Sequence, residues 1–200
     1  MKIDPTIYFA HAAYWGAFGI ARVALRSTGG KGAENPENNP LSKRERTAPF
    51  SRALVAFHMV AFAAMYSAIW LAVASGRIPH WVAGQRIIGS VIIVAAAGLA
   101  VWSLVYFRSW RFRAKLEEGH QLATGGPFRI LRHPIYMSLN LLALGSAIWI
   151  PTALVWSGFA LMIVGSDLRA RAEEKLLDKV FGSVYRDYCM KTRRFLPGIY

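Results

Sequence analysis

Residues 87–107 read IIGSVIIVAAAGLAVWSLVYF, a run that carries no charged side chain. At a rise of 1.5 Å per residue, about 20 such residues cross the roughly 30 Å hydrocarbon core of a bilayer. Residues 6–25 and 53–74 form two further runs of similar length. An amphipathic soluble helix would carry charges along one face, and these runs show no such face. The sequence therefore predicts three membrane-spanning helices.

Two shorter apolar segments, residues 135–150 and 152–166, follow toward the C-terminus. Pro151 lies between them and supplies the break of a tight helical hairpin, because proline cannot continue a helix. Segments of about 15 residues can span a locally thinned bilayer or re-enter it, and the sequence leaves both open. We predict an all-α integral membrane bundle of about five transmembrane helices, a single domain over residues 1–200, with a C-terminal segment that covers the functional site.

The basic residues indicate how the bundle is oriented. The net charge is +13, and 20 of the 24 Lys and Arg residues lie in residues 26–52, in residues 108–132 and after Ser166. The positive-inside rule then puts the N-terminus outside, and the loops 26–52 and 108–134 and the C-terminus in the cytoplasm. Basic residues that flank apolar helices favour membrane lipids over nucleic acid as partners. The small size of the chain favours a bacterial inner membrane.

The start of the chain differs from a cleavable signal peptide. Lys2 is balanced by Asp4, so the basic region that precedes the apolar core of such a signal is missing. We expect the first helix to be retained.

Several common kinds of site are missing from the sequence. The single cysteine, Cys189, allows no internal disulfide and no cysteine metal site, and we predict no bound metal. No H-E-x-x-H, G-x-S-x-G or P-loop motif occurs, and no strand-helix alternation supports a Rossmann domain. His11 and His58 fall within predicted spans. Packed, hydrogen-bonded histidines are the favoured interpretation there, although polar groups inside a membrane can be functional.

Polar residues that could carry chemistry begin in residues 120–136, HQLATGGPFRILRHPIY. Gly125, Gly126 and Pro127 predict a turn. Pro134 suits the first position of a helix, where its missing N–H costs nothing. The backbone N–H groups that follow, with His133 beside them, would then form an anion-binding helix end. The alternative is an ordinary interface, with Arg132 and the aromatic residues as membrane anchors.

A second polar cluster follows the last apolar segment. It contains Asp167, Arg169, Arg171, Glu173, Glu174 and Lys175, on a helix that continues amphipathically to Phe181-Gly182. Arg169 and Glu173 are i, i+4 neighbours on one face, and the plainest interpretation is a solvated surface ion pair. Both clusters, however, lie at the cytoplasmic ends of one hairpin, so we expect them to converge. The aromatic and basic tail could close over the site.

The spacing of these motifs resembles a known family. The order is Gly126-Pro127-Phe128, Arg132-His133-Pro134-x-Tyr136, an apolar hairpin, Glu173-Glu174-x-x-Leu177, Phe181-Gly182-x-x-Tyr185-x-x-Tyr188 and Arg194-x-x-Pro197. This combination is similar to that of the isoprenylcysteine carboxyl methyltransferases, to which phospholipid methyltransferases are related. The resemblance covers a catalytic region of about residues 119–197.

The resemblance implies S-adenosylmethionine as cofactor, with S-adenosylhomocysteine as product. It implies cofactor-binding residues at His120, Gln121, Leu122, Ala123, Phe128, His133, Ile135, Tyr136 and Glu173. Arg169 takes the position that faces the substrate, and Arg169 and Glu173 are the candidate catalytic residues. The family commonly has Tyr where this chain has Phe128, so a phenolic hydrogen bond is lost while a stacking surface remains.

The expected function is methyl transfer to a lipid-like acceptor that enters from the bilayer, such as the carboxylate of a prenylcysteine-like molecule or a related lipophilic substrate. An NADPH-dependent membrane sterol or enoyl reductase is the enzymatic alternative, because such enzymes resemble this family in an Arg-His-x-x-Tyr-like motif. A non-catalytic lipid-binding scaffold is the other alternative. The sequence leaves open whether the acceptor atom is O, N or S, and the oligomeric state.

Overall fold

The computed structural model describes residues 6–28, 51–76, 83–106 and 122–196, and these are almost entirely helical. The elements are α1 (Thr6–Thr28), α2 (Ser51–Ala74), α3 (Ala83–Tyr106), the short 3₁₀ helix η2 (Gly126–Arg129), α4 (Pro134–Trp149), α5 (Ala153–Phe181) and α6 (Ser183–Lys191). Within these ranges there is no strand, only an isolated parallel bridge between Leu131 and Arg193. The predicted all-α class is confirmed.

Length and apolar composition qualify three of the described helices as membrane spans: Arg52–Ala74, Gly84–Tyr106 and Ala153–Phe181. The chain is therefore an integral membrane helical bundle. α1 is long enough, but it carries His11 and Arg22 within its apolar run, so the crossing predicted for residues 6–25 stays a prediction. α4 is shorter, at 16 residues. The fifth apolar segment continues to Phe181 without a break, as its amphipathic continuation predicts.

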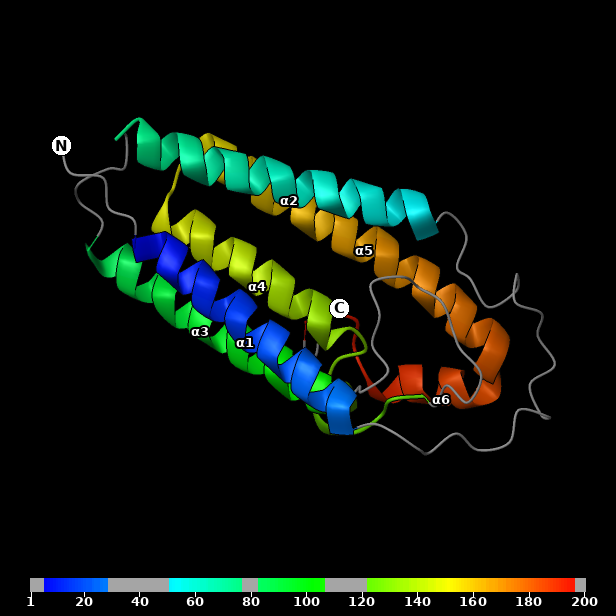
Figure 1. Cartoon of the computed structure of the whole chain (residues 1–200). Coiled ribbons are helices and arrows are strands. Elements are labelled where there is room, and N and C mark those ends of the chain that lie inside the picture. The colour runs from blue at the N-terminus through cyan, green and yellow to red at the C-terminus, as the bar shows by residue number, and fades with distance from the viewer. Residues whose placement is uncertain (1–5, 29–50, 77–82, 107–121, 197–200) are drawn as a thin grey trace.

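Figure 1 shows α4 between two helix pairs, α2 with α5 and α1 with α3. Successive long helices run in opposite directions along the bundle. The C-terminal ends of α1, α3 and α5 and the N-terminal ends of α2 and α4 therefore lie at one end, together with α6 (Figure 1). This end, which we call the basic end, carries the described basic residues Arg132, Arg186, Lys191, Arg193 and Arg194.

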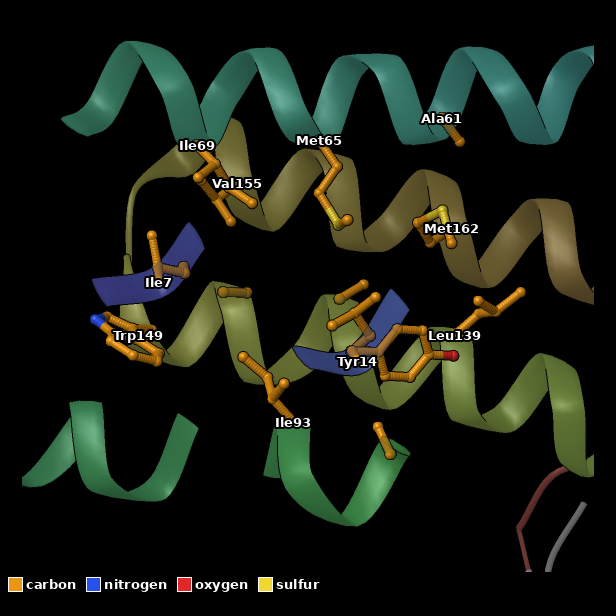
Figure 2. Packing of buried hydrophobic residues seen from close by; sticks show 14 of the residues in the cluster. Ile7, Tyr14, Ala61, Met65, Ile69, Ile93, Leu139, Trp149, Val155 and Met162 are labelled. Atoms are coloured by element: carbon orange, nitrogen blue, oxygen red, sulfur yellow. The ribbon is translucent and has the colours of Figure 1, made fainter. Parts of the chain in front are cut away.

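Small residues let the helices approach closely, as is common when helices pack in membranes. A Cβ on Gly89 of α3 would lie 2.6 Å from the carbonyl oxygen of Gly145 on α4, which is too close for any other residue. On α5, a Cβ at Gly158 would meet Cα of Met65 on α2 at 3.0 Å. Figure 2 shows Met65 in the contact between these two helices.

The predicted hairpin of the fourth and fifth helices is present. Its two helices pack on their neighbours where the glycines allow close approach. Thr152 caps α5 by accepting a hydrogen bond from the backbone N–H of Val155 at 3.3 Å, directly after Pro151. α4 and α5 are in contact, but α4 packs most extensively on α3 and α5 on α2. The hairpin thus joins two helix layers instead of forming a separate unit.

Polar side chains connect α1 to the rest of the bundle. His11 has both ring nitrogens paired, Nδ1 with the Tyr66 hydroxyl and Nε2 with the Ser146 hydroxyl, each at 2.8 Å. Trp15 donates its indole N–H to the same Tyr66 oxygen at 2.6 Å. The packed, hydrogen-bonded histidine predicted at position 11 is confirmed.

Candidate functional site

The first turn of α4 is built as the sequence predicts, with Pro134 at the first helical position. His133 precedes it as the N-cap residue, and its side chain makes no capping hydrogen bond within the described residues. The backbone N–H groups of Ile135 and Tyr136 belong to the turn that has no intrahelical acceptors. His133, Ile135 and Tyr136 are all buried, so these donors lie at a protected, electropositive helix end.

The two predicted clusters meet around Tyr136. The Tyr136 hydroxyl donates a hydrogen bond to Glu173 of α5. The Arg169 guanidinium lies 4.8 Å from the centre of the Tyr136 ring, in cation–π distance. The His133 ring also stacks on Tyr136, with the ring centres 5.6 Å apart and an angle of 11° between the planes. Arg169 is only 4% exposed, so a solvated surface ion pair does not describe it.

His133 lies between two carboxylates. Its Nδ1 is 3.6 Å from Glu173 and its Nε2 is 3.3 Å from Glu174, although Nε2 has no well-oriented hydrogen bond to any described residue. Burial acts to lower the pKa of the imidazole, but the two carboxylates outweigh burial and raise that pKa above its ordinary value. His133 therefore keeps its positive charge to a higher pH than a free histidine.

The C-terminal tail pairs with the strand-like segment before α4. Leu131 and Arg193 form a parallel bridge, in which the Arg132 N–H donates to the Arg193 carbonyl at 2.7 Å. The Arg193 N–H donates to the Ile130 carbonyl at 3.2 Å. Phe195 then places its ring 6.1 Å from that of His133. The tail covers the site at His133, as the sequence predicts.

Glu174 fastens the tail to α5. It accepts from Nε of Arg132 at 2.9 Å, and from Nε and Nη2 of Arg194 at 3.1 and 2.5 Å. Arg132 also donates to the Thr192 carbonyl at 2.7 Å. Arg194 reaches Asp167 as well, at 3.1 Å. We call Glu174, Arg132 and Arg194 the tail clasp.

Sequence reasoning missed the clasp, although all three residues stand in the motifs quoted for the family resemblance. Glu174 lies 42 positions after Arg132 and 20 before Arg194, so no helical periodicity relates the three residues. An available signal was the excess of arginines, because a buried arginine is nearly always paired with an acid.

The other predicted cofactor residues are distributed along the approach to α4. His120 and Gln121 lie outside the described residues. Leu122 and Ala123 are half-buried in the segment before η2. Phe128 is buried in η2, and its carbonyl accepts a hydrogen bond from the Tyr188 hydroxyl at 2.7 Å. The predicted glycine-rich turn is realised as this 3₁₀ helix.

Gly126 is required at that turn for two reasons. Its φ of +54° is costly for other residues, and a Cβ there would lie 2.4 Å from the Tyr106 ring. The glycine therefore lets η2 pack against the end of α3.

An apolar pocket opens beside Arg169. The sequence did not predict this pocket. Its volume is about 290 Å³, and it is lined by Trp15, Phe18, Met59, Phe62, Tyr66, Leu139 and Arg169. Among these lining residues Arg169 alone is charged. α1 and α2 supply most of the wall, although no motif marks them in the sequence. A pocket of this kind suits the apolar part of a ligand whose polar end reaches Arg169.

Comparisons with known proteins match parts of this chain. A sequence profile described as phospholipid methyltransferase matches residues 84–184. Two rice proteins, from Oryza sativa subsp. indica and subsp. japonica, are each described as a probable protein-S-isoprenylcysteine O-methyltransferase. They are 32% identical over 114 residues, which cover 56% of this chain and 58% of theirs. An uncharacterized protein of Haemophilus influenzae is 36% identical over 63 residues, 31% of this chain and 100% of its own. The chain thus spans little more than half the length of the rice relatives.

Proposed function

Because the chain belongs to the phospholipid methyltransferase family, we propose that it is a membrane methyltransferase that uses S-adenosylmethionine to methylate a lipid-like acceptor. The observation that carries this proposal is the convergence of His133, Tyr136, Glu173 and Arg169 at the start of α4, beside an apolar pocket. Such a site offers separate places for a charged, water-soluble donor and an apolar acceptor.

The residues around His133 fit the charges of this cofactor. The amino-acid carboxylate of the cofactor would lie near His133, whose imidazole has a raised pKa, and near the N–H groups at the start of α4. Both are favourable for an anion. Glu173, whose side chain is 22% exposed, would face the positive charge. The Tyr136 hydroxyl donates a hydrogen bond that holds the Glu173 carboxylate in place. When bound, the cofactor supplies a methyl group activated by its attachment to a positively charged sulfur.

The apolar pocket fits the acceptor. Burial of an acceptor chain against Trp15, Phe18 and Phe62 is favoured by about 25 cal/mol per Å² of apolar surface. Arg169 would then orient the polar end of the acceptor toward Tyr136 and Glu173. In-line methyl transfer requires no covalent enzyme intermediate, so positioning and exclusion of water supply most of the rate enhancement. A carboxylate acceptor needs no general base, whereas an ammonium must first lose a proton.

Orientation follows from the basic end of the bundle. The first turn of α4 and the tail lie there, and the positive-inside rule assigns this end to the cytoplasm, where S-adenosylmethionine is made. We therefore propose an inner-membrane protein with its donor site open to the cytoplasm and its N-terminus outside.

Titration calorimetry of the purified protein with S-adenosylmethionine, S-adenosylhomocysteine and NADPH tests this proposal. We expect binding of both sulfur compounds and none of NADPH. Binding of NADPH alone would favour a membrane reductase. Binding of none of the three, together with binding to anionic lipid vesicles, would favour a non-catalytic scaffold.

Two substitutions separate the proposed roles on α5. Glu173→Gln removes charge but keeps shape, so it should weaken cofactor binding by about tenfold or more, the loss of one charged hydrogen bond. Arg169→Ala should leave cofactor affinity nearly intact and reduce methyl transfer to a small prenylated cysteine. The controls are Asp178→Asn and Arg171→Ala, which alter exposed ion pairs of the same helix. Wild-type behaviour of both test variants would contradict the assigned roles.

A further inference from the structure

The apolar pocket is elongated along α2. Met59, Phe62 and Tyr66 line it from one face of that helix, and two turns of helix are about 10 Å long. Trp15 of α1 meets them from across the pocket, with its ring 5.7 Å from that of Phe62. The pocket therefore has two ends, which differ in chemistry.

The charged end lies at Arg169 and the opposite end at Tyr66. Nη1 of Arg169 lies 3.5 Å from Nδ1 of His58, near the start of the lined stretch of α2. Gly158, about three helical turns before Arg169 on α5, packs on Met65, because a Cβ there would lie 3.0 Å from the Met65 Cα. The two helices thus run in opposite directions, and Tyr66, next to Met65, lies far from the guanidinium.

A hydrogen-bonded network closes the end at Tyr66. The Ser146 hydroxyl donates to the Leu142 carbonyl at 2.7 Å, so it accepts from Nε2–H of His11 at 2.8 Å. Both partners of His11 are hydroxyls, which favours a neutral ring inside the bundle. Its Nδ1 then accepts from the Tyr66 hydroxyl at 2.8 Å, and the Tyr66 oxygen accepts from the Trp15 indole N–H at 2.6 Å. Every donor of the network is used, so none is left for a ligand.

The bundle is filled beyond this network. Ile7, Ile69 and Val155 occupy the next turns of α1, α2 and α5, and each is at most 1% exposed (Figure 2). An apolar chain that enters from the charged end therefore meets a wall at Trp15 and Tyr66. Cores packed in this way resist added volume, because overfilling forces side chains out of their favoured rotamers.

The volume of the pocket sets how much chain it holds. It is about 290 Å³, and at about 30 Å³ per carbon, the share of one water molecule in the liquid, it takes about ten carbons. We propose that the pocket selects acceptors whose apolar chain is short, about two isoprene units, and that Trp15 and Tyr66 set this length. The inference rests on the proposed function and narrows its lipid-like acceptor by chain length, whatever polar group the acceptor carries.

A series of small cysteine thioethers with one, two, three and four isoprene units tests the wild-type protein. Calorimetry in the presence of S-adenosylhomocysteine measures their affinities. Affinity should be highest for two units, because one unit leaves the pocket partly empty, and it should fall by about tenfold or more at three units, the effect of overfilling a packed cavity. Equal affinities for two, three and four units, or binding of none of the series, overturn the inference.

Trp15→Leu moves the wall, because leucine is smaller and the Tyr66–His11 hydrogen bond remains. The compound with three units should then bind within about twofold of the compound with two. Tyr66→Phe keeps the ring but releases the hydrogen bonds that hold the wall, so it should relax the preference only in part. The control is Trp156→Leu, the same substitution at a 42% exposed tryptophan of α5 that does not line the pocket. It should keep the wild-type preference. A wild-type preference in Trp15→Leu, or an equal change in the control, overturns the role of the wall.

A labelling experiment on the wild-type protein covers the case in which Trp15→Leu does not fold. A photoreactive group at the chain end of the compound with two units should label the peptide that contains Trp15 or the one that contains Tyr66. Labelling confined to other peptides overturns the inference. Affinity for S-adenosylhomocysteine alone should stay within about twofold in all variants. A wild-type protein that does not bind S-adenosylhomocysteine would instead refute the proposed function itself.

Discussion

Replacing Glu174 by glutamine should open the tail without unfolding the bundle. The carboxylate accepts three hydrogen bonds from Arg132 and Arg194, and all three side chains are only 14 to 15% exposed. Breaking a buried ion pair by removing one partner costs about 3–5 kcal/mol, whereas an exposed pair contributes about 0–1 kcal/mol. The three side chains are mostly buried, so the cost of breaking the clasp should lie near the value for a buried pair. Glutamine keeps one acceptor oxygen, which reduces this cost.

We therefore expect a loss of about 3 kcal/mol in the free energy that holds the tail closed, close to the lower limit for a buried pair. Since 1.4 kcal/mol corresponds to a factor of ten, the open population should rise about a hundredfold. The amides that report this opening are those of Arg132 and Arg193, because the pairing of the tail with residues 130–132 protects them. Local opening of this kind is visible in amide exchange.

Hydrogen exchange measured by mass spectrometry on peptides that contain these two amides provides the assay. Exchange should accelerate about a hundredfold in Glu174→Gln, while peptides from α3 and α4 keep their wild-type rates. Asp178→Asn is the control on the same helix, because the Asp178–Arg186 pair is 48 and 63% exposed. An acceleration below about threefold in Glu174→Gln, or an equal acceleration in the control, would refute the clasp.

Three further outcomes follow from the site and the charge pattern. His133→Ala should weaken S-adenosylhomocysteine binding by about ten- to hundredfold in calorimetry, since a charged hydrogen bond is lost, and an unchanged affinity would remove His133 from the donor site. His133 faces Glu173 and Glu174, and its pKa is raised, so the affinity for S-adenosylhomocysteine should be full at low pH and fall as the pH rises through that pKa. Titrations from pH 6 to 9 measure this fall, and His133→Ala should abolish it. Reporter fusions at Arg77 and Tyr200 should lie on opposite sides of the membrane, and a shared side would overturn the five-segment topology.

Helix positions could be predicted because each depends on a local signal. The apolar run at residues 87–107 corresponds to α3, and Pro134 begins α4 at the first helical position. Phe181-Gly182 marks the end of α5, where Gly182 takes a φ of +54°. Which helices pack together could not be predicted, because it depends on Gly89, Gly145 and Gly158 meeting across helices distant in sequence.

The proposed donor side of the site was more predictable than the clasp. His133, Tyr136 and Glu173 sit at helix positions whose orientation follows from the hairpin, so their meeting could be expected from two segments. The pairing of Glu174 with Arg132 and Arg194 depends on how the tail crosses the start of α4. Nothing local in the tail sequence specifies that crossing.

The proposed acceptor side combines residues inside and outside the part of the chain that matches the family model. Arg169 lies in the matched half of the chain, but Trp15, Phe18 and Phe62 come from α1 and α2, which precede it. The hydrogen bonds of His11 to Tyr66 and to Ser146 connect these two helices to each other and to α4. Under the proposed roles, a chain can keep the donor site of α4 and α5 while changes in its first two helices alter the size and shape of the apolar pocket. This proposed division gives a physical reason why a match over residues 84–184 identifies the family but does not transfer the acceptor of a relative to this chain.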